Sequence, residues 1–160
     1  MTRTAVYPGT FDPITFGHLD VIRRVSSIYD KVFVAVAKSD EKAPLFSVEE
    51  RIKMIESSVS DLVNVTVESF DGLAVAYARS KSARVVVRGL RMISDFEYEF
   101  QMALTNRKLD PAIETVFMMP NEDFSYLSSR LIKEVARLGA DVSAFVPKNV
   151  VIKLKKAMEK

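Results

Sequence analysis

The chain's only histidine, His18, stands where a short apolar strand gives way to a helix. The strand candidate covers residues 4–9 and ends at a Pro-Gly pair, and apolar residues then recur at helical spacing from Leu19 to Tyr29. The first turn of a helix exposes unpaired N–H groups and the positive end of the helix dipole, and both stabilise an anion. Because His18 would lie in that turn, this segment is predicted to bind a phosphate.

The neighbours of His18 fit this prediction. Gly17 has no side chain and would let a ligand approach the backbone, while Thr10 and Thr15 add hydroxyl donors. The alternative is an ordinary surface histidine near a helix start, which is the commoner situation for an isolated histidine. The interpretation therefore depends on the surrounding motif and not on His18 alone.

A second group of candidate residues follows the apolar run 85–87. Arg88 and Arg91 flank Gly89 where this buried strand ends. An arginine fork binds phosphate oxygens in pairs, and the glycine would let a nucleotide lie against the backbone. The alternative is that these arginines form ion pairs with the acidic side chains that follow them, which are Asp95, Glu97 and Glu99.

Two further segments could contribute to the same site. Lys42 lies in a polar loop that follows an apolar strand, although most loop lysines are merely solvated. Hydroxyl residues at Ser125, Ser128 and Ser129 precede a helix and form a second candidate anion site, although serines there are usually plain N-caps.

Apolar β-branched runs alternate with helical patterns along the chain, which predicts an α/β fold: a single-domain, doubly wound parallel sheet of Rossmann-like type. Ligands of such a sheet bind beyond the carboxyl ends of its strands, where the strand order reverses. Neither a G-x-G-x-x-G loop nor a Walker A loop is present. The later strand candidates are Val32–Ala37, Val63–Val67, Arg84–Val87 and Ile113–Met118, and the helix candidates after the first are Val48–Ser58, Leu73–Ser80, Met92–Lys108 and Ser128–Leu138.

Composition limits the class of protein. The 160 residues, 48% hydrophobic and 28% charged, suit one globular domain covering residues 1–160. No run is long enough to span a membrane and no targeting segment is recognisable, so we expect a cytoplasmic protein without a membrane partner. A net charge of +2 does not argue for nucleic acid as a partner. With no cysteine and one histidine, a catalytic metal would be an oxygen-bound ion such as magnesium.

The predicted helix Met92–Lys108 carries apolar residues nearly all the way round. Such a helix should be covered on more than one side. A tighter core would explain the pattern in the simplest way, whereas a subunit interface or an apolar substrate groove would explain more of it.

Two motifs resemble the signatures of the nucleotidylyltransferase superfamily. Residues Thr15 to His18 resemble its Thr/His-x-Gly-His signature, and Leu127 to Val135 resembles the Ser-Ser pair that opens a basic helix near the C-terminus. More narrowly, almost the whole chain is similar to the bacterial phosphopantetheine adenylyltransferases. The segments that carry this narrower resemblance are Tyr7–Thr15, Gly17-His18, Arg88–Arg91, Asp95–Glu99, Asn106-Arg107 and Lys133–Arg137.

The resemblance implies a reaction and its partners. ATP and 4′-phosphopantetheine would give dephospho-coenzyme A and pyrophosphate, the penultimate step of coenzyme A biosynthesis. It also implies Mg2+ carried mainly by the nucleotide phosphates with no protein metal site, coenzyme A as a candidate feedback inhibitor, and a homohexamer. Attack by the acceptor's phosphate on the α-phosphorus of ATP would be in line, without a covalent enzyme intermediate, so catalysis would consist of positioning and charge stabilisation.

The family's functional positions carry over residue by residue. His18, as transition-state stabiliser, and Lys42 and Arg91 would be catalytic. The residues implied for ATP are Thr10, Phe11, His18, Gly89, Leu90, Arg91, Glu99, Phe124, Ser125, Tyr126, Leu127, Ser128, Ser129 and Arg130, and those implied for the acceptor are Thr10, Lys42, Leu73, Ala74, Arg88, Met102 and Asn106. Arg130 replaces a frequent small hydroxyl residue, and Ala74 is smaller than the usual apolar residue.

Two other function classes fit part of the pattern. Another small nucleotidylyltransferase, acting on nicotinamide mononucleotide or on glycerol phosphate with CTP, would share His18 and Ser129 but not the run from Arg88 to Glu99. A nucleotide-binding regulatory module would share the phosphate sites without turnover.

Overall fold

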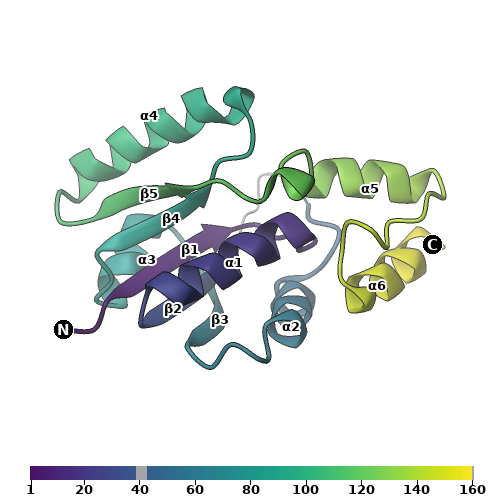
Figure 1. Cartoon of the computed structure of the whole chain (residues 1–160), viewed down its shortest axis with the longest axis horizontal. Coiled ribbons are helices and arrows are strands. Elements are labelled where there is room, and N and C mark those ends of the chain that lie inside the picture. Colours follow the sequence, from purple (N-terminus) through teal and green to yellow (C-terminus); the bar gives the residue numbers. More distant parts are fainter. Residues whose placement is uncertain (39–42, 160) are drawn as a thin grey trace.

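Within residues 1–38 and 43–159, which this computed structural model describes, five parallel strands form one sheet in the order β3-β2-β1-β4-β5 (Figure 1). Every neighbouring pair runs parallel, which confirms the predicted α/β doubly wound sheet. The assignment of all 160 residues to one domain stays a prediction. The strands are β1 (Thr4–Gly9), β2 (Lys31–Ala37), β3 (Val65–Phe70), β4 (Val85–Gly89) and β5 (Glu114–Met118).

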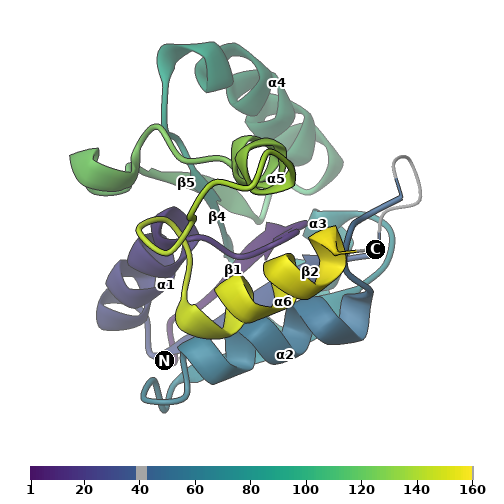
Figure 2. The ribbon, with the colours of Figure 1, turned by 90° about the vertical axis from the view of Figure 1, so that its right-hand side faces the viewer.

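Helices cover both faces of the sheet. Alternate residues of β1 point to opposite faces: Ala5 and Tyr7 join the core shared with α1, α2, α5 and α6, and Val6 joins a smaller core under α3. Figure 2 shows α6 lying beside α2, and the Asn149 amide donates to the Met54 carbonyl across that contact at 3.1 Å. The helices are α1 (Phe16–Ile28), α2 (Val48–Ser58), α3 (Ala74–Ser80), α4 (Ile93–Leu109), α5 (Ser129–Arg137) and α6 (Lys148–Met158), with a 3-10 turn η1 (Glu122–Phe124). None of these helices, within the described ranges, combines the length and apolarity needed to cross a membrane.

Most predicted boundaries differ from the observed ones by one or two residues, but the start of the third strand was predicted wrongly. Strand β3 begins at Val65 and extends to Phe70, whereas the sequence pattern predicted Val63–Val67. Val63 is fully exposed, and the Asn64 amide donates to the carbonyls of Ser26 and Tyr29 at 2.8 and 3.0 Å. Residues 63 and 64 therefore belong to the turn between α2 and β3, which packs against the carboxyl end of α1.

The strand order reverses between β1 and β4. From β1 the chain moves outward through β2 to β3, and it then returns to place β4 and β5 on the other side of β1. The connections from β1 and β4 thus diverge, and the carboxyl ends of these two strands border a crevice. The first signature follows β1 and the arginine segment follows β4, so both predicted phosphate-binding segments meet there.

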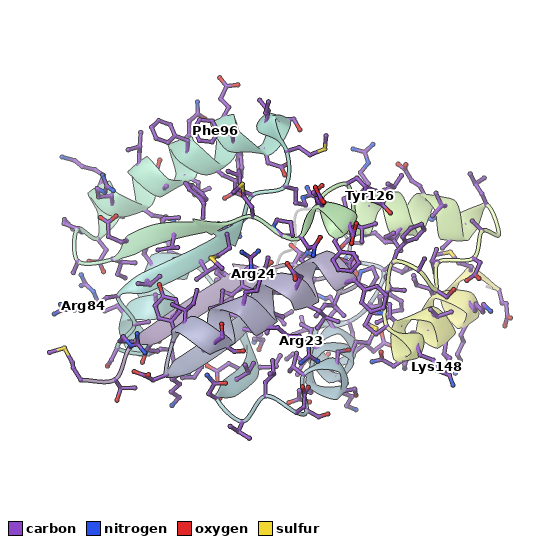
Figure 3. The ribbon with its side chains drawn as sticks, viewed as in Figure 1. Arg23, Arg24, Arg84, Phe96, Tyr126 and Lys148 are labelled. Atoms are coloured by element: carbon purple, nitrogen blue, oxygen red, sulfur yellow. The ribbon has the colours of Figure 1, made fainter. Side chains whose placement is uncertain are left out.

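Helix α4 lies along the edge strand β5, and its apolar side chains do not enter a core. Within α4, which the structure describes in full, Glu99 and Asn106 are the buried residues. Phe96 and Phe100 stack with ring centroids 5.5 Å apart on an exposed face, and Figure 3 shows Phe96 pointing away from the sheet. The tighter core is therefore wrong as an explanation of this pattern, and the exposed apolar side chains are Ile93, Phe96, Tyr98, Phe100, Met102, Leu104 and Leu109.

An apolar surface of this kind is typical of an interface, so we expect Phe96→Glu to weaken self-association. The variant should give a smaller particle mass than the wild type by light scattering, because a carboxylate cannot be buried there unpaired. Ile152→Glu is the matched control, since Ile152 is an exposed apolar residue on α6. An unchanged mass for Phe96→Glu would contradict the prediction.

Candidate active site

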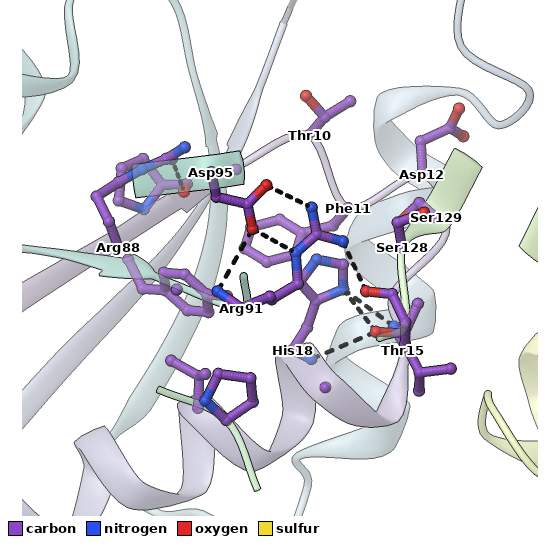
Figure 4. A pocket seen from close by; sticks show the side chains of 18 of the residues that line it. Thr10, Phe11, Asp12, Thr15, His18, Arg88, Arg91, Asp95, Ser128 and Ser129 are labelled. Atoms are coloured by element: carbon purple, nitrogen blue, oxygen red, sulfur yellow. Dashed lines mark hydrogen bonds and ion pairs between the residues drawn. The ribbon is translucent and has the colours of Figure 1, made fainter. Parts of the chain in front are cut away.

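A cavity of about 620 Å³ opens at the carboxyl ends of β1 and β4. It brings together the first signature, the arginine segment from Arg88 to Arg91 and the start of α5 (Figure 4). The described residues that line it are Tyr7, Pro8, Gly9, Thr10, Phe11, Asp12, Thr15, Gly17, His18, Val21, Ala43, Pro44, Arg88, Gly89, Arg91, Asp95, Glu99, Pro120, Leu127, Ser128, Ser129 and Lys133.

His18 takes part in the capping box that begins α1. The Thr15 hydroxyl accepts a hydrogen bond from the His18 N–H at 3.4 Å, and the Thr15 N–H donates to His18 Nδ1 at 3.1 Å. In most capping boxes the residue three positions after the N-cap is Glu or Gln. Here the His18 imidazole takes that place. The start of α1, which was predicted to bind an anion, therefore also holds the His18 ring in position.

This hydrogen bond determines which ring nitrogen carries the proton. Because Nδ1 of His18 accepts from the Thr15 backbone, the neutral ring carries its proton on Nε2. Burial, together with the smaller effects of the nearby charges of Arg91 and Arg88, lowers the pKa of His18 from 6.5 to about 4. At neutral pH the ring is therefore an uncharged donor in the wall of the cavity.

The Phe11 ring packs against the His18 ring. Its own ring meets the His18 ring edge to face at 5.1 Å and the Tyr7 ring at 5.2 Å. The backbone of Phe11 has a φ of 50°, a left-handed conformation that costs a non-glycine residue energy and is concentrated at functional sites. A Cβ at Gly9 would lie 2.9 Å from the Phe11 ring, so a glycine is required there. Phe11 is thus buried and acts as a scaffold for His18.

The reason predicted for Gly17 needs a correction. Gly17 lines the cavity, as expected, but a Cβ there would also lie 3.3 Å from the backbone carbonyl of Phe124. The absent side chain therefore makes room for the segment that leads to the second signature as well as for a ligand.

Both arginines of the second group line the cavity, and both also form the ion pairs considered as the alternative. Arg88 binds Glu99 through two hydrogen bonds of 2.9 and 2.7 Å and donates to the Pro8 carbonyl at 2.9 Å. Arg91 pairs with Asp95 at 3.2 Å and donates to the Leu127 carbonyl at 2.6 Å. Figure 4 shows the contacts that join Arg91 to Asp95 and His18 to Thr15. Ion pairing thus holds both guanidinium groups in place at the wall of the cavity.

The second signature reaches the cavity through its two serines and Leu127. Ser128 is the N-cap of α5, with its hydroxyl accepting from the Leu131 N–H at 3.1 Å, so the plain capping role is present. The Ser129 hydroxyl donates to the Pro13 carbonyl at 2.7 Å and so joins the two signatures. The start of α5 therefore borders the cavity.

Several predicted residues do not line the cavity among those that the structure describes. Ser125 donates to Glu122 within η1, Tyr126 packs on Phe145, and Arg130 is exposed and pairs with Glu134. The remaining ones are Leu90, Leu73, Ala74, Met102, Asn106 and Phe124. Lys42 lies outside the described residues. Functional roles for all of these remain predictions.

Sequence reasoning assigned no role to three charged residues near the cavity. Asp12 and Lys133 form a partly buried ion pair of 2.8 Å, and Arg51 is almost fully buried next to the loop that follows β1. A signal existed for Asp12, because an acid within a loop predicted to bind anions needs a compensating cation. Lys133 belongs to the second signature, but nothing in the local pattern indicated its pairing with Asp12, which lies 121 residues away.

The carboxylates of the cavity do not form a metal site of their own. Within the described ranges there is no group of three or more His, Cys, Asp or Glu residues placed to hold an ion. Asp12, Asp95 and Glu99 are engaged by Lys133, Arg91 and Arg88. The roles of Mg2+ stay predictions.

Comparison with known proteins identifies the family of the chain. Residues 6–135 match the cytidylyltransferase-like family model. A phosphopantetheine adenylyltransferase of Caldanaerobacter subterraneus subsp. tengcongensis is 49% identical over 99% of both chains, and one of Thermosynechococcus vestitus is 56% identical over 91% of this chain and 87% of its own. This chain belongs to the phosphopantetheine adenylyltransferase family.

The fold of this phosphopantetheine adenylyltransferase family member is confirmed by a solved structure whose sequence identity to the chain is much lower than that of these relatives. The bifunctional NMN adenylyltransferase/ADP ribose pyrophosphatase of Francisella tularensis superimposes with a TM-score of 0.72 at 18% identity, over 100% of this chain and 51% of that one. At this identity the likeness concerns the fold alone. The shared fold is that of a nucleotidylyltransferase domain, as the signatures predicted.

The lowered pKa of His18 predicts a pH-dependent stability. In the unfolded chain the imidazole titrates near 6.5, whereas in the folded protein its pKa is about 4. The unfolded state therefore binds more protons between these values, and the free energy of unfolding should fall by about 1.4 kcal/mol per pH unit as the pH drops through this window.

His18→Gln is the control for this prediction, because glutamine is an ordinary capping-box residue and does not titrate. Urea unfolding of both proteins between pH 7 and pH 4 should show the wild type losing stability relative to the variant. A difference that stays constant across the range would show that His18 is not held neutral by the fold.

Proposed function

We propose that this protein transfers the adenylyl group of ATP to 4′-phosphopantetheine and so forms dephospho-coenzyme A and pyrophosphate in coenzyme A biosynthesis. Relatives with this name, identical to the chain at about half of its positions over nearly its full length, carry the proposal. The cavity supports it, because two helix starts, two arginines and a neutral histidine converge where two phosphate-bearing substrates would meet.

In the proposed mechanism an oxygen of the acceptor's phosphate attacks the α-phosphorus of ATP in line. The new P–O bond forms as the bond to the departing pyrophosphate breaks, and no covalent enzyme intermediate arises. His18 donates from Nε2 to the α-phosphate as negative charge builds up, which is the role of a preorganised transition-state donor. Arg91 and the start of α5 stabilise the nucleotide phosphates, and Arg88 binds the acceptor's phosphate.

No general base is needed for this reaction. A phosphate monoester has a second pKa of about 6, so near neutral pH the acceptor is already mostly a dianion. The carboxylates that line the described part of the cavity are Asp12, Asp95 and Glu99, and each is held in an ion pair. The oxygens of these carboxylates are occupied by cations, so these side chains serve to orient the cations.

Further proposals concern partners and assembly. We propose that Mg2+ accompanies the ATP phosphates, that coenzyme A competes for the cavity as a feedback inhibitor, and that the protein is cytoplasmic with neither nucleic acid nor membrane as a partner. The exposed apolar residues of α4 support self-association, and we propose the homohexamer that the family resemblance implies.

Pyrophosphate release tests the function directly. The purified protein is incubated with ATP and one of three acceptors: 4′-phosphopantetheine, its dephosphorylated form pantetheine, or nicotinamide mononucleotide. A separate incubation contains CTP and glycerol phosphate. Of these acceptors, we expect only phosphopantetheine to give pyrophosphate release with ATP. Pantetheine should not react, because its hydroxyl would require a base. With phosphopantetheine, kcat should rise as the phosphate ionises and then level off. Comparable kcat values for pantetheine would reveal a general base, and release only with another acceptor would refute the proposed function.

We expect His18→Ala to lower kcat by a hundredfold or more while ATP binding stays within roughly tenfold, as for the loss of one transition-state donor. His18→Gln keeps the capping box and so separates catalysis from the start of α1. Steady-state kinetics and ATP titration of both variants provide the measurement. A near-wild-type kcat for His18→Ala would contradict the assigned role.

A further inference from the structure

Arg51 is a buried cation that binds carbonyl groups in place of a carboxylate. Its side chain is 1% exposed, and within the described residues it forms no ion pair. Nε donates to the Phe46 carbonyl at 3.1 Å, and Nη1 donates to the carbonyls of Thr10 and Ala37 at 2.7 and 3.1 Å. Removing a charge from water is costly, so three dipoles aimed at one guanidinium indicate a specific arrangement.

The three carbonyls come from segments that meet at the cavity. Thr10 follows β1 and lines the cavity, Ala37 is the last residue of β2, and Phe46 precedes α2. In the sequence, residues 38–45 lie between Ala37 and Phe46 and include Lys42. One guanidinium therefore fastens the loop after β1 to both flanks of this segment.

Asp12 reinforces the same arrangement with the opposite charge. Its carboxylate accepts from the N–H groups of Leu45 and Phe46 at 2.8 and 2.9 Å, and from Lys133 Nζ at 2.8 Å. Phe46 is thus held at its N–H by Asp12 and at its carbonyl by Arg51. Two residues of the fastened segment, Ala43 and Pro44, line the cavity directly.

We propose that Arg51 is a positioning residue for the acceptor substrate. It fixes the loop after β1 and the flanks of the segment 38–45 relative to each other, and thereby sets the wall against which the phosphate end of phosphopantetheine binds. The inference rests on the proposed function. Arg51 does not line the cavity, so it acts through Thr10 and through the segment that includes Ala43 and Pro44.

Lysine cannot reproduce this arrangement. A guanidinium donates from separate nitrogens in a rigid plane, whereas an ammonium donates from a single point. A displacement of about 1 Å at a reacting group can cost a hundredfold in rate, so a partly filled set of hydrogen bonds should be visible in the kinetics.

The test compares Arg51→Lys and Arg51→Gln with the wild type. KM for phosphopantetheine should rise at least tenfold in both variants, whereas KM for ATP, for which Thr10 is also implied, should rise at least threefold less. Ile55→Ala is the matched control, because Ile55 is fully buried one turn further along α2 and makes no contact with the three carbonyls through hydrogen bonds. Melting temperatures of all four proteins establish that each is folded at the assay temperature.

Three results would overturn the proposal: a rise of both KM values together, as in Ile55→Ala; no rise in either KM; or failure of both Arg51 variants to fold, which would make the residue purely structural. A lysine variant that is less impaired than the glutamine variant would support it, because lysine retains the charge and some of the donors. The activity of the wild type with phosphopantetheine tests the proposed function by itself. The Arg51 test compares KM values of each variant with those of the wild type, so failure of one proposal can be told from failure of the other.

Discussion

The reversal of strand order between β1 and β4 is the constraint on which the site depends. Two crossovers leave the middle of a parallel sheet in opposite directions, and side chains cannot fill the space between them as they fill the core under α1 or α3. The backbone turns at the ends of both strands therefore face each other across an open crevice. Gly9, Phe11 and the start of α1 occupy one wall, and Arg88 begins the other.

Charge within this crevice is balanced before any substrate arrives. Each of the cations Arg88, Arg91 and Lys133 has a carboxylate partner, which holds the side chain in place and reduces the cost of removing its charge from water. Groups that are already oriented require little reorganisation when phosphates bind. The neutral His18 fits the same environment, because a third positive charge beside Arg88 and Arg91 would be unfavourable.

Local sequence predicted the parts of the site that local backbone geometry produces. A histidine after an apolar strand and a helix N-cap pair such as Ser128 and Ser129 can be recognised from neighbours alone. The ion pair of Asp12 and Lys133 and the carbonyl contacts of Arg51 could not be predicted in this way, because their partners meet only when separate loops pack. The exposed face of α4 shows a related limit: its pattern allowed a tighter core, a subunit interface or an apolar groove, and only the packed structure shows that the protomer's own core does not cover these side chains.

The pairing of the two signatures has a consequence for synthesis on the ribosome. Asp12 meets Lys133 across 121 residues, Ser129 meets the Pro13 carbonyl across 116, and the Asp20 carboxylate holds the Asn121 N–H at 2.8 Å. The amino-terminal half of the chain can form β1 and α1 early, but the part of the cavity wall that the start of α5 and Lys133 contribute is missing until α5 has emerged. An incomplete nascent chain therefore displays its phosphate-binding loop without the cation that neutralises Asp12, and competence for chemistry comes only at the end of translation.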